Sequence, residues 1–261
     1  MSAVTILSTT NLCIGYATEK VVNQIASELN LNLAEGKLIA LIGANGVGKS
    51  TLLRTLTGIQ KPISGSVELA GKPLDGLGAS EMAQQISVVL TENLPPSNLT
   101  VFELVALGRQ PYTDWMGTRS SDDKKMIEWA MEQTQIVEKK KKKHHEISDG
   151  QLQRVLISRA LPQDTPEIIV DEPTTHLDLL HKVSLLKLLK KLSKETNKCI
   201  VFSTHDIDMA IQVADEMIVM TADSVVQDEP CNLISKGTFS KLFDDSSITF
   251  DATFGKFIIS G

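Results

Sequence analysis

Short, continuous apolar runs recur along the chain, each long enough for a strand but too short for a buried helix. The run Leu38–Ile42 (LIALI) ends at Gly43 and has no polar position on either face. Such a run is typical of a strand in a parallel sheet, which is covered on both faces. Runs of the same kind predict further strands at Ile86–Leu90, Glu167–Val170, Cys199–Ser203 and Met217–Met220.

The segments between these runs repeat apolar residues at helical spacing. A helix that begins at Lys49 would place Leu52, Leu53 and Leu56 on one side, and Gly58 suits its end. Further helical patterns cover Leu179–Leu192, Gly150–Leu161 and the region of Met126, Trp129, Ala130 and Val137. Because strands alternate with helices, we expect an α/β fold with a mostly parallel sheet that is covered on both faces.

The middle of the chain has the densest helical patterning. Thr100-Val-Phe-Glu103 is a capping box, which marks the start of a helix. We therefore expect a single domain, 1–261, whose core comes from about 1–90 and 163–261. A helical subdomain from about 91–162 is inserted into that core.

Further strands are indicated outside the parallel sheet. Val67 and Leu69 alternate with polar residues before the turn at Gly71, which predicts a half-exposed antiparallel strand. The tail after Ala222 can add small strands, although its pattern is weak.

Residues Gly43 to Thr51 (GANGVGKST) fit the pattern G-x-x-x-x-G-K-[ST] of a phosphate-binding loop. The glycines let successive backbone N–H groups converge on a phosphate, and the start of the helix adds partial positive charge. Lys49 would bring a full charge to the β- and γ-phosphates, and Ser50 a hydroxyl to Mg²⁺. A glycine-rich turn that merely contains a lysine is the alternative, and the strand, loop and helix in succession disfavour it.

Two carboxylates and one histidine follow other predicted strands. Asp171 and Glu172 end the run IIV, and His205 follows IVFST. In P-loop enzymes an acidic residue at this place holds Mg²⁺, and the next can activate the attacking water. Ligands of parallel sheets bind beyond the carboxyl ends of the strands, where all of these residues fall. An ordinary acidic strand exit and a structural histidine are the alternatives.

Composition and charge restrict the function classes. Among 261 residues the net charge is −6, whereas proteins that hold nucleic acid are usually basic. Three widely spaced cysteines suggest a reducing compartment. We see no signal peptide and no apolar run long enough for a membrane span. The lysine run Lys139–Lys143 is thus a local feature, most simply a solvated surface, and neighbouring His144 and His145 complete no metal site.

The segment Ile147–Gln151 (ISDGQ), which opens a predicted helix, resembles the LSGGQ signature of ABC-type ATPases. The order of Tyr16, GANGVGKST, ISDGQLQR, IIVDEPTTHLD and STH is also that family's order, and the resemblance covers nearly the whole chain. Within the family, LTVFELVALGRQPYTDWMG and LFDDSSITFDATFGKFII resemble importers of iron complexes (siderophore, haem) or cobalamin.

The resemblance implies a role for each motif. Tyr16, which on spacing alone could equally be a packed surface aromatic, would stack on adenine. Asp171 would hold Mg²⁺, with Glu172 as the catalytic carboxylate and His205 as the switch histidine. The remaining ATP-binding set would be Gly43, Asn45, Gly46, Gly48, Lys49, Ser50 and Thr51, with Ser148, Gly150, Gln151 and Asp178 acting across a dimer.

Two positions depart from the family pattern. Asp149 stands where a second glycine is usual. A carboxylate near phosphate is unfavourable unless it points away, and we expect only a minor effect here. The loop that normally supplies a glutamine to Mg²⁺ has Thr91 and Glu92 instead. We expect Thr91 to serve the metal, directly or through water, and Glu92 to face the permease.

The resulting expectation is an ATP-hydrolysing importer subunit, with ATP and Mg²⁺ as cofactors. It would pair with a second copy of itself on the cytoplasmic face of the membrane. Its partners would be a transmembrane permease and, indirectly, a substrate-binding protein, without nucleic acid. The rivals are a DNA-acting ABC ATPase of the SMC or repair type, which would need long coiled-coil heptads, and a P-loop kinase or GTPase, which would lack ISDGQ.

Overall fold

The computed structural model describes residues 4–17, 21–90, 97–113, 120–243 and 247–259. Its centre is a six-stranded sheet in the order β11-β10-β4-β9-β8-β7. All neighbours in it are parallel except the edge strand β11, which is antiparallel to β10. The strands are β4 (Leu38–Gly43), β7 (Ile86–Val89), β8 (Glu167–Val170), β9 (Cys199–Ser203), β10 (Glu216–Met220) and β11 (Val225–Asp228). The mostly parallel α/β core predicted from the apolar runs is confirmed.

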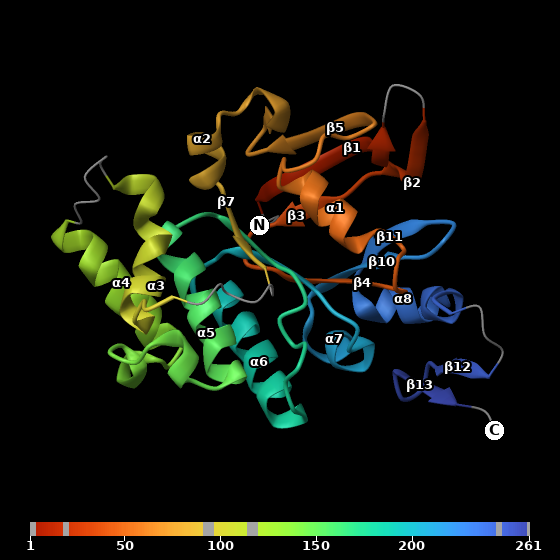
Figure 1. The fold of residues 1–261 in the computed structure, drawn as a ribbon. Coiled ribbons are helices and arrows are strands. Elements are labelled where there is room, and N and C mark those ends of the chain that lie inside the picture. The colour runs from red at the N-terminus through yellow and green to blue at the C-terminus, as the bar shows by residue number, and fades with distance from the viewer. Residues whose placement is uncertain (1–3, 18–20, 91–96, 114–119, 244–246, 260–261) are drawn as a thin grey trace.

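A second, antiparallel sheet lies above the first in Figure 1. Its strands are β1 (Thr5–Ala17), β2 (Val22–Leu29), β3 (Asn32–Ala34), β5 (Ser64–Leu69) and β6 (Lys72–Pro73). The alternation of Val67 and Leu69 correctly marked β5, where both side chains are buried. Between the sheets lies α1 (Lys49–Leu56). Gly58 follows its end in a left-handed conformation, as the sequence predicted.

Helices cover the other face of the central sheet. Alternate residues of β4 point to opposite faces, so Ile39 and Leu41 pack toward the antiparallel sheet, and Ala40 and Ile42 pack toward the helices. This two-sided burial is the reason for the continuous apolar run. The remaining helices are α2 (Ala79–Ala83), α3 (Val101–Ala106), α4 (Ser121–Gln133), α5 (Asp149–Ala160), α6 (Leu179–Glu195), α7 (Ile207–Val213) and α8 (Pro230–Ser235).

Helices α3, α4 and α5 pack on one another at one side of the molecule (Figure 1). Thr100 caps α3, because its hydroxyl accepts from the N–H of Glu103 and the Glu103 carboxylate accepts from the N–H of Thr100. The helix around Trp129 is shorter than predicted, because Gln135 adopts a left-handed φ of 60° just after it. Val137 therefore lies outside α4 in a 3₁₀ turn and is 40% exposed, which corrects its assignment to the helix face.

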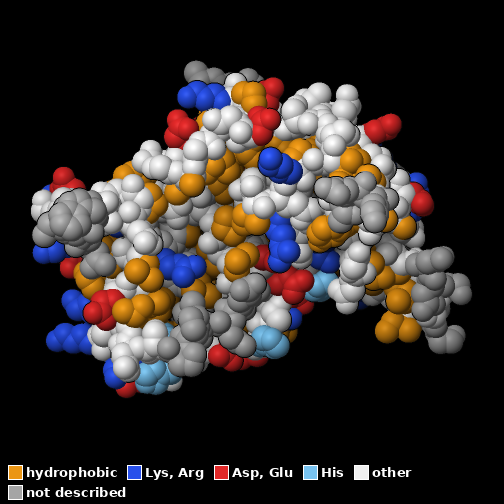
Figure 2. Space-filling view, turned by 45° about the horizontal axis from the view of Figure 1, so that its top comes forward, with side chains coloured by type: hydrophobic (Ala, Val, Ile, Leu, Met, Phe, Trp, Pro, Cys, Tyr) orange, Lys and Arg blue, Asp and Glu red, His pale blue; other side chains and the backbone are white. Residues whose placement is uncertain are grey.

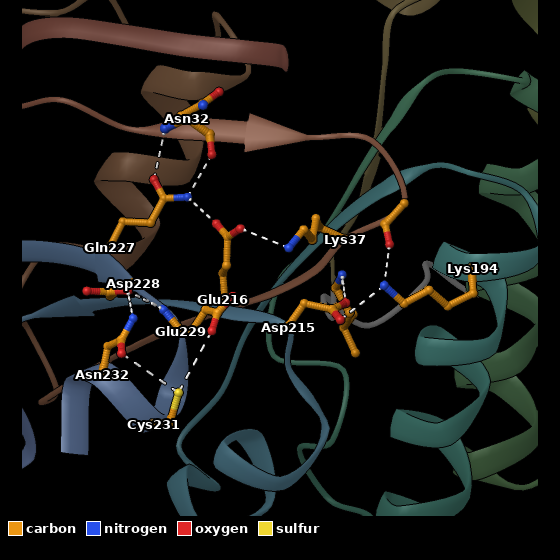
Figure 3. Close-up of polar contacts among 12 residues, drawn as sticks. Asn32, Lys37, Lys194, Asp215, Glu216, Gln227, Asp228, Glu229, Cys231 and Asn232 are labelled. Carbon is orange, nitrogen blue, oxygen red and sulfur yellow. Dashed lines mark hydrogen bonds and ion pairs between the residues drawn. The ribbon is translucent and has the colours of Figure 1, made fainter. Parts of the chain in front are cut away.

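A polar network connects the β11 edge of the central sheet to the antiparallel sheet (Figure 3). The Gln227 side chain exchanges hydrogen bonds of 2.8 and 2.7 Å with the backbone of Asn32, and it also donates to Glu216, which pairs with Lys37 at 3.3 Å. These contacts join β3 of the antiparallel sheet to β10 and β11. The chain then ends in a hairpin of β12 (Ile248–Asp251) and β13 (Lys256–Ile259), so the weak strand signal of the tail was genuine.

Candidate functional site

The candidate residues follow three neighbouring parallel strands and lie at the carboxyl ends of these strands. β4, β9 and β8 are adjacent and run in the same direction. Their carboxyl ends lead into Gly43, Thr204 and Asp171, respectively. The motifs that lie far apart in the sequence therefore meet where open α/β sheets bind ligands.

The loop from Gly43 leads directly into α1, and its shape depends on Gly48. Gly48 has a φ of 111°, and a Cβ built there would lie 2.3 Å from Ile25 Cγ2. Only glycine fits both the backbone angle and the space. The ammonium of Lys49 folds back into this loop and donates to the carbonyls of Gly43 (2.9 Å) and Ala44 (3.2 Å).

Lys49 is only 6% exposed, so its charge is already largely removed from water. Burial lowers its pKa, and the nearby carboxylates of Glu172 and Asp171 act in the opposite direction. A cation held in a loop of backbone N–H groups at a helix start is suited to phosphate.

Ser203, the last residue of β9, organises the acidic pair. Its hydroxyl donates to Asp171 Oδ1 at 2.5 Å and accepts from the backbone N–H of Glu172 at 2.8 Å. The sequence reasoning missed this residue. The available signal was a serine at the end of the otherwise apolar strand CIVFS.

Glu172 and His205 are in direct contact. His205 Nε2 lies 2.7 Å from Glu172 Oε1, and the Thr175 hydroxyl donates to Oε2 at 3.3 Å. Glu172 has a φ of 46°, an unusual angle for a residue with a side chain, and such strain concentrates at functional positions. Both side chains remain partly exposed, at 32% and 45%, so the carboxylate is held in place yet accessible to water.

Tyr16 lies beside the same helix. It is the second-last residue of β1 and is half exposed, and its hydroxyl is 3.2 Å from Thr51 Oγ1 in the first turn of α1. The structure thus brings Tyr16 to the phosphate loop, and its stacking on adenine stays a prediction.

The signature residues lie elsewhere on the surface. Ser148 caps α5 by accepting from the N–H of Gln151, and Asp178 caps α6 in the same way through His181. Among the described residues, no hydrogen bond or ion pair joins Ser148, Gly150 or Gln151 to the loop 43–51. Asp149 is the exposed first residue of α5, where the helix start stabilises a carboxylate.

The described part of the chain holds no group of three or more metal-ligating histidine, cysteine or carboxylate side chains. Thr91 and Glu92 lie outside the described residues. Ser50 and Asp171 supply a hydroxyl and a carboxylate, which are ligand types that Mg²⁺ accepts when phosphate oxygens complete its shell. Within the described ranges, no helix is both long and apolar enough to cross a bilayer.

Comparison with known proteins agrees with this geometry. Residues 26–175 match the ABC transporter family. An uncharacterized ABC transporter ATP-binding protein of Methanocaldococcus jannaschii is 38% identical, with 96% of this chain and 86% of that protein covered. The iron(3+)-hydroxamate import ATP-binding protein of Bacillus subtilis is 37% identical, with 85% and 81% covered.

Solved structures give the same result. A bacterial ABC transporter cassette solved as a dimer superimposes with a TM-score of 0.73 at 28% identity, covering 86% of this chain and 99% of that one. The same cassette has been solved with ADP and Pi bound. The chain belongs to the ABC transporter family and is an ABC-type ATPase.

Proposed function

We propose that this ATPase powers the import of an iron complex, such as a ferric siderophore or haem, or of cobalamin. It would act on the cytoplasmic face of the membrane, bound to a permease that a substrate-binding protein loads. The relative in B. subtilis, named for import of iron(3+)-hydroxamate, supports the substrate class. The observation that carries the ATPase part is the convergence of Lys49, Asp171, Glu172 and His205 at one sheet edge.

ATP hydrolysis follows from the contacts of these residues. The loop 43–50 and Lys49 bind the phosphates and fix the γ-phosphate in front of Glu172. Glu172 accepts a proton from water as the oxygen of that water bonds to the γ-phosphorus and the bond to ADP breaks. His205, 2.7 Å from Oε1, holds the carboxylate in that orientation.

Mg²⁺ would be held by Ser50 and Asp171, with Thr91 as a further oxygen donor. When bound, it neutralises charge on the β- and γ-phosphates. Asp171 is fixed for this purpose by the hydroxyl of Ser203.

The signature loop completes the site of a second copy. In the part of the chain that the structure describes, no hydrogen bond or ion pair joins Ser148 or Gln151 to their own phosphate loop, and both lie at the start of α5, where a helix attracts anions. Placed across a two-fold dimer, Ser148, Gly150 and Gln151 would contact the γ-phosphate held by the partner. The exposed Asp178 would lie at the same interface.

Lys49→Ala tests the ATP site. The variant should keep its fold and lose ATPase activity by about 100-fold or more, because a buried phosphate-directed charge is removed. Lys61→Ala, an exposed lysine just beyond α1, is the matched control and should retain wild-type turnover. Normal turnover in Lys49→Ala would refute the site.

The transported molecule is tested with the permease that this subunit serves, reconstituted in vesicles together with its substrate-binding protein. ATP-dependent uptake of a ferric hydroxamate, haem or cobalamin is expected, and Lys49→Ala should abolish it. Uptake of none of the three, in vesicles that hydrolyse ATP, would overturn the substrate class and leave the ATPase assignment in place.

A further inference from the structure

His181 packs directly on the signature glycine of its own chain. A Cβ built on Gly150 would lie 2.9 Å from Cδ2 and 3.4 Å from Cγ of the His181 ring. Gly150 is the second residue of α5, and His181 lies in the first turn of α6. The two helices begin at the same end of the molecule and run side by side (Figure 1), and Arg154 also joins them by donating to Ser184 at 2.7 Å.

The backbone does not explain why position 150 is glycine. Gly150 is helical, and its φ lies outside the left-handed range that favours glycine. The position requires a residue without a side chain, because the ring of His181 occupies the space in which a Cβ would lie.

The His181 ring is fixed from the other side. Its Nδ1 lies 2.8 Å from Asp178 Oδ1, which also accepts the backbone N–H of His181 at 2.8 Å. The hydrogen bond from the backbone N–H of His181 and, to a smaller extent, the one from its ring lower the pKa of Asp178. A methyl group at position 150 would therefore have to displace a ring that is tied to the residue proposed to lie at the dimer interface.

The same helical turn also touches the loop of His205. Lys182 donates to Asp206 Oδ1 at 2.9 Å, and Asp206 Oδ2 accepts from Thr174 at 2.9 Å. Successive residues of α6 thus contact the signature loop and the loop next to the catalytic pair.

We propose that His181 is a positioning residue, whose ring sets the spacing between the first turn of α6 and the signature loop. At this spacing Ser148, Gly150 and Gln151 can reach the ATP of the second copy. The inference rests on the proposed dimer mechanism and adds a residue to it. The competing explanation is that Gly150 is small only to admit the partner's phosphate.

A double-mutant cycle separates the two explanations. In the Glu172→Gln background, the dissociation constant of the dimer in the presence of ATP is measured for Gly150→Ala, for His181→Ala and for the double variant. We expect Gly150→Ala to weaken the dimer by about tenfold or more and His181→Ala by about threefold, as contacting residues do. The dimer of the double variant should be at least about threefold tighter than that of Gly150→Ala, because the alanine methyl group no longer meets the His181 ring.

Absence of this rescue would overturn the proposal, since a Cβ that blocks phosphate blocks it whatever residue stands at 181. A His181→Ala variant that dimerises like its parent would also overturn it. Lys187→Ala, an exposed residue of α6, is the control and should leave the dimer unchanged. The melting temperature of each variant, measured without ATP, reports any loss of fold.

The cycle is repeated on kcat in the otherwise wild-type chain, with KM for ATP as a check on nucleotide binding. Rescue is expected in kcat, with KM nearly constant, because the chain's own phosphate loop is untouched. If Glu172→Gln itself fails to dimerise, the dimer mechanism fails. If dimers form but neither assay shows rescue, only the role of His181 fails.

Discussion

At the scale of single residues, the contact between Glu172 and His205 determines how the carboxylate is aimed. The histidine holds Oε1 at 2.7 Å, while Oε2 accepts the longer hydrogen bond of 3.3 Å from Thr175. His205→Ala should therefore lower kcat by roughly 100-fold with little change in ATP affinity, as loss of a group that orients a base does. His145→Ala, an exposed histidine before the signature, is the control. Equal loss in both variants would contradict this role.

The sequence identified the residues whose chemistry is visible in a short motif. Gly43, Asp171 and His205 were predicted at strand ends, Lys49 was predicted at the start of the following helix, and the structure places all of them at the same end of the central sheet. Ser203 and His181 were not found, because their importance depends on neighbours in space. The serine that ends the apolar run CIVFS was a weak signal by itself, and a histidine that packs on a glycine of another helix leaves no pattern along the chain.

Glu167 is the least expected residue of the core. It starts β8, is fully buried, and within the described residues neither carboxylate oxygen has a hydrogen-bond partner. Burial raises its pKa from 4.5 to about 8. It lies beside the Cys199 thiol, whose pKa is raised by its own burial and by the Glu167 and Glu216 carboxylates.

This burial makes the stability of the protein dependent on pH. The folded state favours the protonated acid, so there is no penalty below pH 4.5. Stability is lost between that pH and about 8, at up to ~1.4 kcal/mol per pH unit, because the unfolded chain releases the proton. Glu167→Gln has no proton to release. In urea unfolding, its stability relative to wild type should rise from pH 5 to pH 8 and then level off, and a difference independent of pH would refute the buried acid.

At the scale of helices and strands, the sequence predicted those elements whose surroundings are uniform. Strands buried on both faces, such as β4 and β9, appear as unbroken apolar runs. In α6, the inward positions Leu185, Leu188, Leu189 and Leu192 are buried as predicted. β1 and β2 were not predicted, because register shifts interrupt the alternation of β1 and much of β2 is exposed. The boundaries of the helical subdomain stay a prediction.

The lysine run has a structural role that does not involve its charge. The carbonyls of Lys142 and Lys140 accept from the first N–H groups of α3, at Val101 and Phe102, while the side chains of Lys140 to Lys142 are exposed. Replacing Lys139–Lys143 by glutamine should therefore leave ATPase activity within about threefold, as for ordinary surface changes. Deleting Lys141 and Lys142 should instead destabilise the helical region. Loss of activity in the glutamine variant at unchanged melting temperature would show that the charge matters.

At the scale of the whole molecule, family membership and the import relative give no support to the DNA-acting alternative. On the face shown in Figure 2, the described basic and acidic side chains are interspersed and form no continuous basic surface. The net charge of −6 agrees with this distribution. The chain is better suited to protein partners than to a polyanion.

The central claim is that two copies close around ATP and part after hydrolysis. It is tested most directly by the mass of Glu172→Gln in solution, measured by light scattering with ATP and with ADP. The amide fills the space of the carboxylate but cannot take the proton, so ATP stays bound. We expect a dimer with ATP, a monomer with ADP, and no ATP-dependent dimer when Lys49→Ala is added. A monomer under every nucleotide condition would contradict the account.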